Sequence, residues 1–182
     1  GEGTPKEMID AYKRVLVGQY NEADEKNASK AESVNPNLLE YGDKSAVIEN
    51  YSITDDRNVQ TTAIMKGTKF TIHMDVDFKE DIQAPIFAFS IKNIKGTEIT
   101  GTNTMYEKAF LEAVKKGERK QVTFTQEMNL QGGEYLLSLG VTGFDGCDFQ
   151  VYHRLYDVIN ITVVSDKDTV GFYDMNSAIE VK

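Results

Sequence analysis

The sequence predicts an all-β fold: an antiparallel two-sheet β-sandwich, immunoglobulin-like or jelly-roll, that follows a short N-terminal helix. The main observation is the alternation in residues 70–78, Phe-Thr-Ile-His-Met-Asp-Val-Asp-Phe, where every second side chain is apolar. This pattern is typical of a strand with one buried side and one solvent-facing side. Further short apolar runs follow, separated by turns that contain Gly or Asp. With 40% hydrophobic residues, nine Phe and nine Tyr, the chain can bury a core between two sheets.

The chain of 182 residues divides into three predicted parts. Residues 1–20 are expected to form a helix, because Thr-Pro-Lys-Glu at 4–7 is a capping start and apolar side chains then recur at helical spacing. Residues 21–40 are rich in Asn, Glu, Asp, Lys and Ser, a composition typical of a flexible linker. Residues 41–182 carry the strand patterns and form the predicted sandwich domain.

The strands are expected in chain order wherever a short apolar or alternating run is bounded by turn residues. The expected positions are 46–53, 70–78, 85–93, 122–124, 135–141, 151–164 and 170–181. Pro85 stands at the entry of its strand, where a missing backbone N–H is tolerated. Between the third and fourth strands, residues 106–114 are expected to form a single helical turn.

Composition excludes two classes of partner. The formal net charge is −9 and the isoelectric point is about 4.8. Nucleic acids require clustered Lys and Arg, so no nucleic-acid partner is expected. Anionic lipid is a poor match for the same reason. Cys147 is the only cysteine, so the chain cannot form an intrachain disulfide.

The sequence contains few candidate catalytic groups. The sequence contains no glycine-rich phosphate loop ending in Lys-Ser/Thr and no Gly-x-Ser-x-Gly motif. His73 and His153 are the only histidines, and neither has a second His or Cys at metal-ligand spacing, so we expect no metal and no cofactor. Asp75 and Asp77 allow a hypothesis of a small carbohydrate-active enzyme, but a solvated strand face is the favoured interpretation.

Recognition is the remaining chemistry. Tyr152, Arg154 and Tyr156 share one parity of a predicted strand, with Asn160 further along. If this parity faces outward, it presents flat rings and a guanidinium donor, which suit the C–H faces and hydroxyls of sugars. The alternative is that the tyrosines are half-buried in the core. Asn103 is a further candidate contact, although a capped turn is the favoured interpretation.

The order of five segments resembles a known family. A Pro-Ile-Phe-x-Phe strand that ends in a glycine turn (85–96) is followed by Gly-Thr-Asn-Thr (101–104) and Leu-x-x-Gly-x-Tyr-x-Leu-x-x-Gly-Val (130–141). Tyr-Asp and an alternating strand then follow (156–163), and residues 3–12 are similar to a helix that leaves an ATPase core. Together they resemble the C-terminal domain behind the ATPase domain of polysaccharide ABC exporters of the Wzt type, which handle O-antigen.

The resemblance implies a cytoplasmic carbohydrate-binding domain at the inner face of the cell membrane. The domain would recognise a cell-surface polysaccharide for export, while an upstream ATPase domain would join it to a transmembrane permease. The chain itself would not be an enzyme. The resemblance also implies a homodimer, with exchange of a C-terminal strand at residues 171–181. The alternative from another class is a structural or dimerisation module without glycan specificity.

Overall fold

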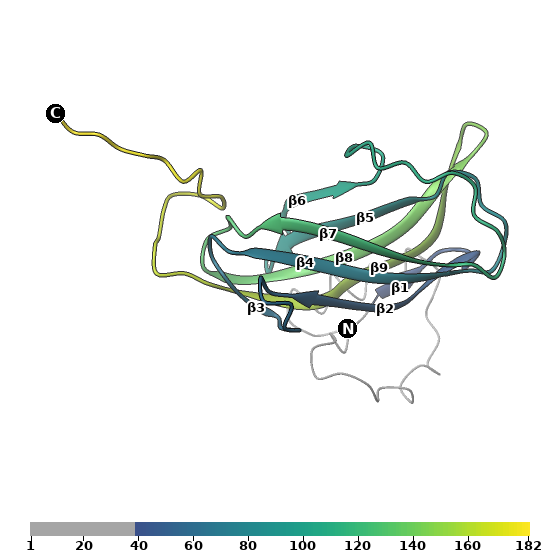
Figure 1. The fold of residues 1–182 in the computed structure, drawn as a ribbon, viewed down its shortest axis with the longest axis horizontal. Helices are drawn as coiled ribbons and strands as arrows, with labels where there is room; N and C mark the ends of the chain where they lie inside the picture. The colour runs from purple at the N-terminus through teal and green to yellow at the C-terminus, as the bar shows by residue number, and fades with distance from the viewer. Residues whose placement is uncertain (1–38) are drawn as a thin grey trace, which may run out of the picture.

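The computed structural model describes residues 39–182, and within this range the chain folds into two β-sheets packed face to face (Figure 1). In chain order the strands are β1 (Leu39–Tyr41), β2 (Ala46–Thr54), β3 (Ala63–Met65), β4 (Lys69–Phe78), β5 (Ile86–Asn93), β6 (Glu98–Asn103), β7 (Arg119–Glu127), β8 (Gly133–Asp145) and β9 (Asp148–Val164). The larger sheet has the order β1-β9-β8-β5-β6, with β3 pairing parallel to β9. The smaller sheet has the order β2-β4-β7, and its pairs are antiparallel.

The core lies between the two sheets. On β4 every second side chain is buried, and the buried set is Phe70, Ile72, Met74, Val76 and Phe78. On β5 the alternate residues Phe87, Phe89 and Ile91 face the same core. The Phe89 ring meets the Phe124 ring of β7 edge-on, with centroids 5.1 Å apart. Each such side chain contributes roughly 2 kcal/mol by leaving water, so the alternation fixes which side of each strand faces inward.

Most of the expected strands are confirmed. Residues 46–53, 70–78, 135–141 and 151–164 lie in β2, β4, β8 and β9, and residues 122–124 lie in β7. The strand expected at 85–93 is β5, which begins one residue after Pro85. The short strands β1, β3 and β6 were not predicted. Each lies at the margin of the larger sheet and forms because a long neighbour, β9 or β5, offers backbone hydrogen bonds.

The prediction of a helical turn at residues 106–114 is wrong. The chain makes one turn after β6, closed by the Ala109 N–H, which donates to the Thr104 carbonyl at 2.8 Å. It then runs without regular structure to Val114, whose N–H and C=O both pair with Ile82 at 2.9 Å. Pairing with Ile82 replaces the i to i−4 bonds that a helix would need.

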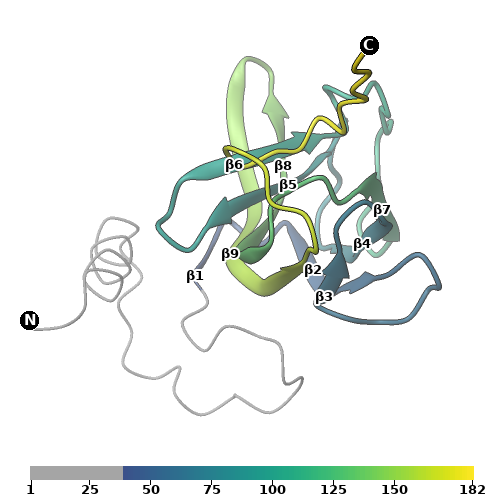
Figure 2. The same cartoon turned by 90° about the vertical axis from the view of Figure 1, so that its left-hand side faces the viewer.

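The strand expected at residues 170–181 is also absent in the single chain. Tyr173 forms an isolated antiparallel bridge with Leu130, and the chain then leaves the sandwich as an extended, exposed segment (Figures 1 and 2). A strand needs a neighbour for its backbone groups, and beyond Asp174 this segment runs away from both sheets.

The strand β1 lies partly in the segment expected to be a linker. It covers Leu39–Tyr41 and so includes the last two residues of that segment. The helix predicted for residues 1–20 and the rest of the linker lie outside the described residues.

Candidate functional site

The tyrosines of β9 do not share one face. Val141 lies opposite His153, whereas Thr142 lies opposite Val151, so Tyr152 is an additional residue at a β-bulge. Its side chain is only 8% exposed and belongs to the core, with its hydroxyl against Gly143. Of the two orientations left open by the sequence, the outward row with Arg154 and Tyr156 is therefore wrong for Tyr152, and a position in the core is the one observed. A bulge inverts the strict alternation on which that expectation depended.

Arg154 and Tyr156 do face outward, and Tyr41 of β1 joins them. The rings of Tyr41 and Tyr156 are stacked, with centroids 5.8 Å apart and planes at 21°. The Arg154 guanidinium carbon lies 5.2 Å from the centroid of the Tyr156 ring. We call these three residues the Tyr–Arg face. Stacking and cation–π contact hold the three flat groups in fixed orientations.

The Tyr156 hydroxyl stays protonated at every physiological pH. Burial, together with a side-chain hydrogen bond to Tyr41, raises the pKa of Tyr156 to about 12, while the Arg154 charge opposes the shift. A phenol in this state can both donate and accept hydrogen bonds.

A single row of paired residues crosses the outward face of the larger sheet. Tyr41 lies opposite Arg154, Arg154 opposite Gly140, Gly140 opposite Ala88, and Ala88 opposite Asn103. Paired residues project on the same side of a sheet, so Asn103 and the Tyr–Arg face bracket two small residues. The strands are about 4.8 Å apart, so Arg154 on β9 and Asn103 on β6 are separated by roughly 14 Å.

The neighbouring row is also small. Ser138 of β8 lies opposite Ser90 of β5, and Ser90 lies opposite Gly101 of β6. We call Gly140, Ala88, Ser138 and Ser90 the small-residue floor. At Gly140 the aliphatic stem of Arg154 packs close to the backbone, 3.9 Å from the position that a Cβ would occupy. This contact helps to place the guanidinium over Tyr156.

A buried ion pair borders the floor. The Lys92 ammonium lies 2.8 Å from the Asp157 carboxylate, and both side chains are less than 10% exposed. The Asp157 N–H donates to the Ser138 hydroxyl at 3.0 Å, and the hydroxyl lies 3.4 Å from the carboxylate. Asp157 has a φ of 56°, within a second irregularity of β9. The pair therefore joins β5, β8 and β9 beside the Tyr–Arg face.

Asn103 caps a turn, which is the interpretation that the sequence favoured. Its side-chain oxygen accepts a hydrogen bond from the Tyr106 N–H at 2.8 Å, which caps the turn after β6. The turn interpretation is confirmed. The same side chain also stands at the far end of the row that starts at Tyr41.

The acidic candidates lie on the outer face of the smaller sheet. Asp77 forms an ion pair with Arg119 of β7, and hydrogen bonding to this guanidinium lowers the pKa of Asp77. His73 makes a side-chain hydrogen bond with Thr54 at 2.8 Å. Asp75 lies between them, opposite Asn50 and Gln121. This arrangement is a solvated strand face with one paired carboxylate, as expected.

Residues 39–182 contain neither a group of metal-binding side chains nor a membrane-spanning helix. No group of three or more His, Cys, Asp or Glu side chains in this range is arranged to hold a metal ion. No helix in the same range is long and apolar enough to cross a membrane.

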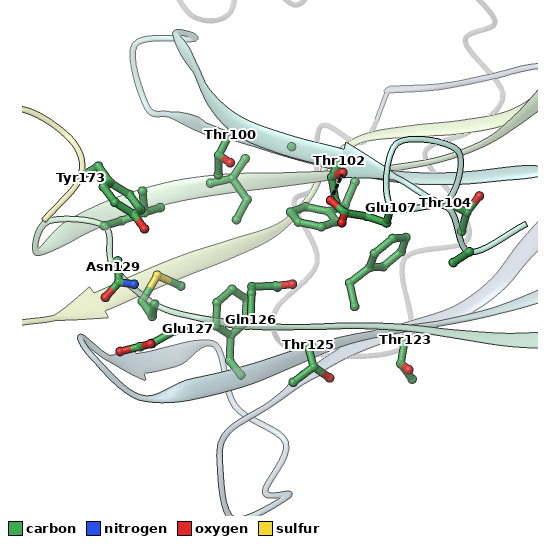
Figure 3. Close-up of a pocket in the computed structure, with 18 residues that line it drawn as sticks. Thr100, Thr102, Thr104, Glu107, Thr123, Thr125, Gln126, Glu127, Asn129 and Tyr173 are labelled. Atoms are coloured by element: carbon green, nitrogen blue, oxygen red, sulfur yellow. Dashed lines mark hydrogen bonds between the residues drawn. The ribbon is translucent and has the colours of Figure 1, made fainter. Parts of the chain in front are cut away.

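A cleft opens between the sheets on the side of β6 and β7 (Figure 3). We call it the edge cleft; its volume is about 630 Å³. Its apolar lining includes Phe70, Phe89, Ile91, Phe124, Met128 and Leu130. Thr100 and Thr102 of β6 and Thr123 and Thr125 of β7 stand along it, and Tyr173 lies at one end.

Gln126 is the unusual polar residue of the edge cleft. It lies opposite the core residue Phe70 and shares the inward parity of Phe124 on β7. Its side-chain nitrogen is buried and has no hydrogen-bond partner in the structure. A buried amide without a partner costs about 1–3 kcal/mol, so this position favours an additional partner.

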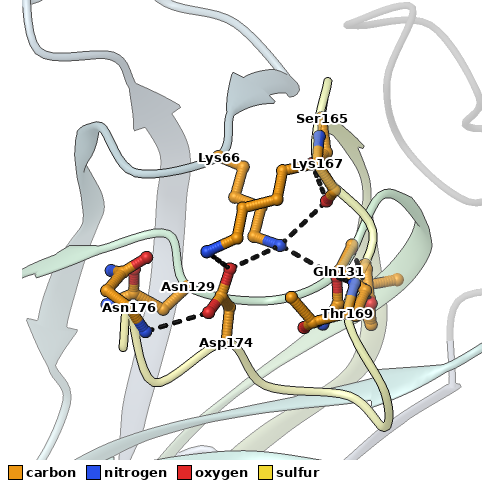
Figure 4. A network of polar contacts seen from close by, with 9 residues as sticks. Lys66, Asn129, Gln131, Ser165, Lys167, Thr169, Asp174 and Asn176 are labelled. Carbon is orange, nitrogen blue, oxygen red and sulfur yellow. Dashed lines mark hydrogen bonds and ion pairs between the residues drawn. The ribbon is translucent and has the colours of Figure 1, made fainter. Parts of the chain in front are cut away.

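The C-terminal segment is fastened at one end of the edge cleft (Figure 4). The Asp174 carboxylate lies 2.7 Å from the Lys167 ammonium and 3.1 Å from that of Lys66. It also accepts the Asn176 N–H at 2.9 Å. Hydrogen bonds from Lys167, the Asn176 backbone and Lys66 lower the pKa of Asp174 well below its usual range. Lys66 also donates to Gln131 at 2.8 Å.

Three residues of these sites were not predicted from the sequence: Tyr41, Gln126 and Asp174. Tyr41 stood in the first position after the expected linker, and only the pairing of β1 with β9 places it on Tyr156. The alternation of β7 does contain a signal for Gln126, because a polar residue interrupts the apolar parity of Val122, Phe124 and Met128.

Fold and site together define a β-sandwich domain with the Tyr–Arg face on its larger sheet and the edge cleft between its sheets. The family model of the Wzt C-terminal domain matches residues 37–175, and the chain belongs to this family. It is therefore a non-catalytic domain with a role in a polysaccharide ABC transporter. The resemblance found in the sequence is confirmed.

One solved structure agrees with this assignment. The chain is similar to the crystal structure of the C-terminal domain of Wzt, with 25% identity, a TM-score of 0.76, and coverage of 82% of this chain and 92% of that one. The CARDB domain of PF1109 from Pyrococcus furiosus is more distant, with 13% identity, a TM-score of 0.37, and coverage of 63% and 94%. The search of curated proteins found no match.

Proposed function

We propose that this domain binds a cell-surface polysaccharide on the Tyr–Arg face and so selects the glycan that an ABC exporter transports. The observation that carries the proposal is the row from Tyr41 and Arg154 to Asn103 across the small-residue floor. A sugar ring can stack its C–H face on a fixed tyrosine, while a guanidinium and an amide bond its hydroxyls. The row spans roughly 14 Å across three strand spacings, so its two ends can contact different units of one polymer.

Family membership supports the rest of the proposal. The domain would act on the cytoplasmic side of the membrane, attached to the ATPase subunit and through it to the permease. O-antigen or a related glycan would be the ligand. The acidic net charge of −9 suits a neutral sugar or one with positively charged groups better than an anionic polymer.

The proposal is tested by calorimetric titration with purified bacterial O-antigen polysaccharides and their terminal oligosaccharides. Tyr156→Ala should weaken binding at least tenfold, because it removes the ring that both Tyr41 and Arg154 contact. Phe110→Ala is the matched control, since Phe110 is an exposed aromatic outside this face. Circular dichroism and thermal melting show whether each variant is folded. Unchanged affinity in a folded Tyr156→Ala variant would remove the Tyr–Arg face from the site.

We also propose that the domain forms a homodimer that exchanges C-terminal segments. The exposed segment within 171–181 supports this, because it leaves the sandwich without pairing to a strand in the described chain. A dimer that binds no member of the polysaccharide panel would favour the alternative, a dimerisation module without glycan specificity.

A further inference from the structure

The strand β9 contains two additional residues where it passes β8. On one side of this irregularity Leu139 lies opposite Leu155. On the other side Leu137 lies opposite Ile159, so three residues of β9 face a single residue of β8. The three residues are Tyr156, Asp157 and Val158. A bulge of this kind bends its strand and re-aims the side chains beside it.

The bulge changes the side of the sheet that two of these residues face. Strict alternation from the core residue Leu155 would place Asp157 in the core and Val158 outside it. Instead Val158 is fully buried in the core, and the Asp157 carboxylate meets Lys92 on the outward side. The φ of Asp157 is 56°, a value that is uncommon for residues other than glycine. Such a conformation persists only where the surroundings hold it.

Three contacts hold Asp157 in this conformation. The Lys92 ammonium reaches the carboxylate from β5, across β8, at 2.8 Å. The Ser138 hydroxyl accepts the Asp157 N–H at 3.0 Å, where the bulge interrupts the strand ladder. The same hydroxyl lies 3.4 Å from the carboxylate. We call Lys92, Ser138 and Asp157 the bulge clamp.

Stability alone does not account for the charged pair of the bulge clamp. The Lys92 and Asp157 side chains are both less than 10% exposed, so both have lost most of their hydration. A buried ion pair of this kind is often no more stabilising than apolar residues of the same volume. It does fix a geometry, because each buried charge must keep its partner.

That geometry affects Tyr156, which directly precedes Asp157. The Tyr156 ring stacks on Tyr41 and lies 5.2 Å from the guanidinium carbon of Arg154. On the side of β9 away from β8, Tyr156 pairs with β1, which has only three residues. A ladder of three pairs is short, so the bulge clamp supplies the remaining constraint on the backbone beside Tyr156.

We propose that the bulge clamp positions Tyr156 for glycan binding, by fixing the bulge that sets its ring against Tyr41 and Arg154. The proposal rests on the proposed function of the Tyr–Arg face and assigns positioning residues to it. The clamp acts through the ring rather than by contact with the sugar, because its charged side chains are buried.

The test compares two double variants that remove a buried Lys–Asp pair by the same substitutions. Lys92→Met with Asp157→Asn dismantles the bulge clamp. Lys66→Met with Asp174→Asn is the matched control, since these side chains are 7% and 5% exposed. Lys66 donates its N–H to the Val164 carbonyl, eight residues along β9 from Tyr156, or roughly 25 Å. Urea unfolding establishes that both variants are folded.

Two quantities are measured on each folded protein. Nuclear Overhauser effects between labelled tyrosine rings, assigned with Tyr41→Phe and Tyr156→Phe, report the contact of the two rings. Calorimetry reports the affinity per site for the O-antigen oligosaccharide that the wild type binds. In the clamp variant the ring contact should be lost and the affinity should fall at least fivefold. The control variant should keep the ring contact and an affinity within twofold of wild type.

Ser138→Ala tests the uncharged member of the bulge clamp. It removes the acceptor of the Asp157 N–H, so hydrogen exchange of this amide should become at least tenfold faster and the ring contact should weaken. Unchanged exchange and an unchanged ring contact would remove Ser138 from the clamp.

The outcomes separate this proposal from the function on which it rests. A clamp variant that keeps both the ring contact and the affinity would overturn the positioning role while glycan binding remains. Loss of affinity with the ring contact intact would also overturn it, because the pair would then act by another route than Tyr156. A wild-type protein that binds no polysaccharide of the panel would overturn the proposed function itself.

Discussion

The Nδ1 atom of His153 lies 2.8 Å from the backbone nitrogen of Ile48, so a buried imidazole of β9 accepts an amide hydrogen bond from β2. Its Nε2 atom must then carry the proton, and it donates to the Glu40 carboxylate of β1 at 2.6 Å. One neutral ring thus ties β9 to a strand of the opposite sheet and to β1, which carries Tyr41.

This bond predicts a pH-dependent stability. Burial lowers the pKa of His153 to about 4, helped by the Lys44 charge, whereas the unfolded chain has a value near 6.5. Above pH 6.5 the ring is neutral in both states. As pH falls from 6.5 towards 4, the unfolded state gains the proton before the folded state does, so the free energy of unfolding should fall by about 3 kcal/mol. Urea titrations across this range measure the loss.

His153→Gln is the matched variant for that experiment. A glutamine can accept from Ile48 and donate to Glu40, but it does not titrate between pH 4 and 6.5. Its stability should depend less on pH than that of the wild type. An equal pH slope in both proteins would exclude His153 as the source.

The Arg154 guanidinium should not be replaceable by an ammonium. Arg154→Lys keeps the charge but loses the planar group over Tyr156 and its fixed pattern of donors. We expect it to recover little of the glycan affinity lost in Arg154→Ala. Full recovery in calorimetry would mean that charge alone is recognised.

The Lys92–Asp157 pair should be costly to break from one side. Lys92→Met leaves the buried Asp157 carboxylate without its partner and should reduce the free energy of unfolding by about 3 kcal/mol. Combining it with Asp157→Asn removes the unpaired charge, and Asn tolerates the positive φ of this position. Chemical denaturation should therefore find the double variant more stable than Lys92→Met alone; the reverse order would contradict the assigned pairing.

Gly42 should be essential for the placement of Tyr41. A Cβ at Gly42 would lie 2.4 Å from the Tyr152 carbonyl oxygen, and its φ of 130° is unfavourable for other residues. Gly42→Ala should cost more than about 2 kcal/mol in the free energy of unfolding. Gly67→Ala is the control, because Gly67 also has a positive φ of 78° but has no neighbour within 4 Å of a Cβ. Thermal melts that shift equally would contradict the steric argument.

The sequence by itself determined the sandwich and most of its strands. On β4 and β5 the side that faces the core follows directly from the two-residue period, because apolar side chains must leave water whatever the partner strand is. The family was also readable from the order and spacing of its segments. Arg154 and Tyr156 were correctly placed on a strand, whereas β6, which carries Asn103, was not predicted.

Only the tertiary structure decided how these residues meet. Tyr152 turned inward because a bulge in β9 shifts the register against β8, and a bulge depends on two strands together. Tyr41 reached Tyr156, and Asn103 entered the same row, through pairings between strands far apart in the chain. The C-terminal segment has the pattern of a strand and forms none in the single chain, because a strand is made by the neighbour that satisfies its backbone.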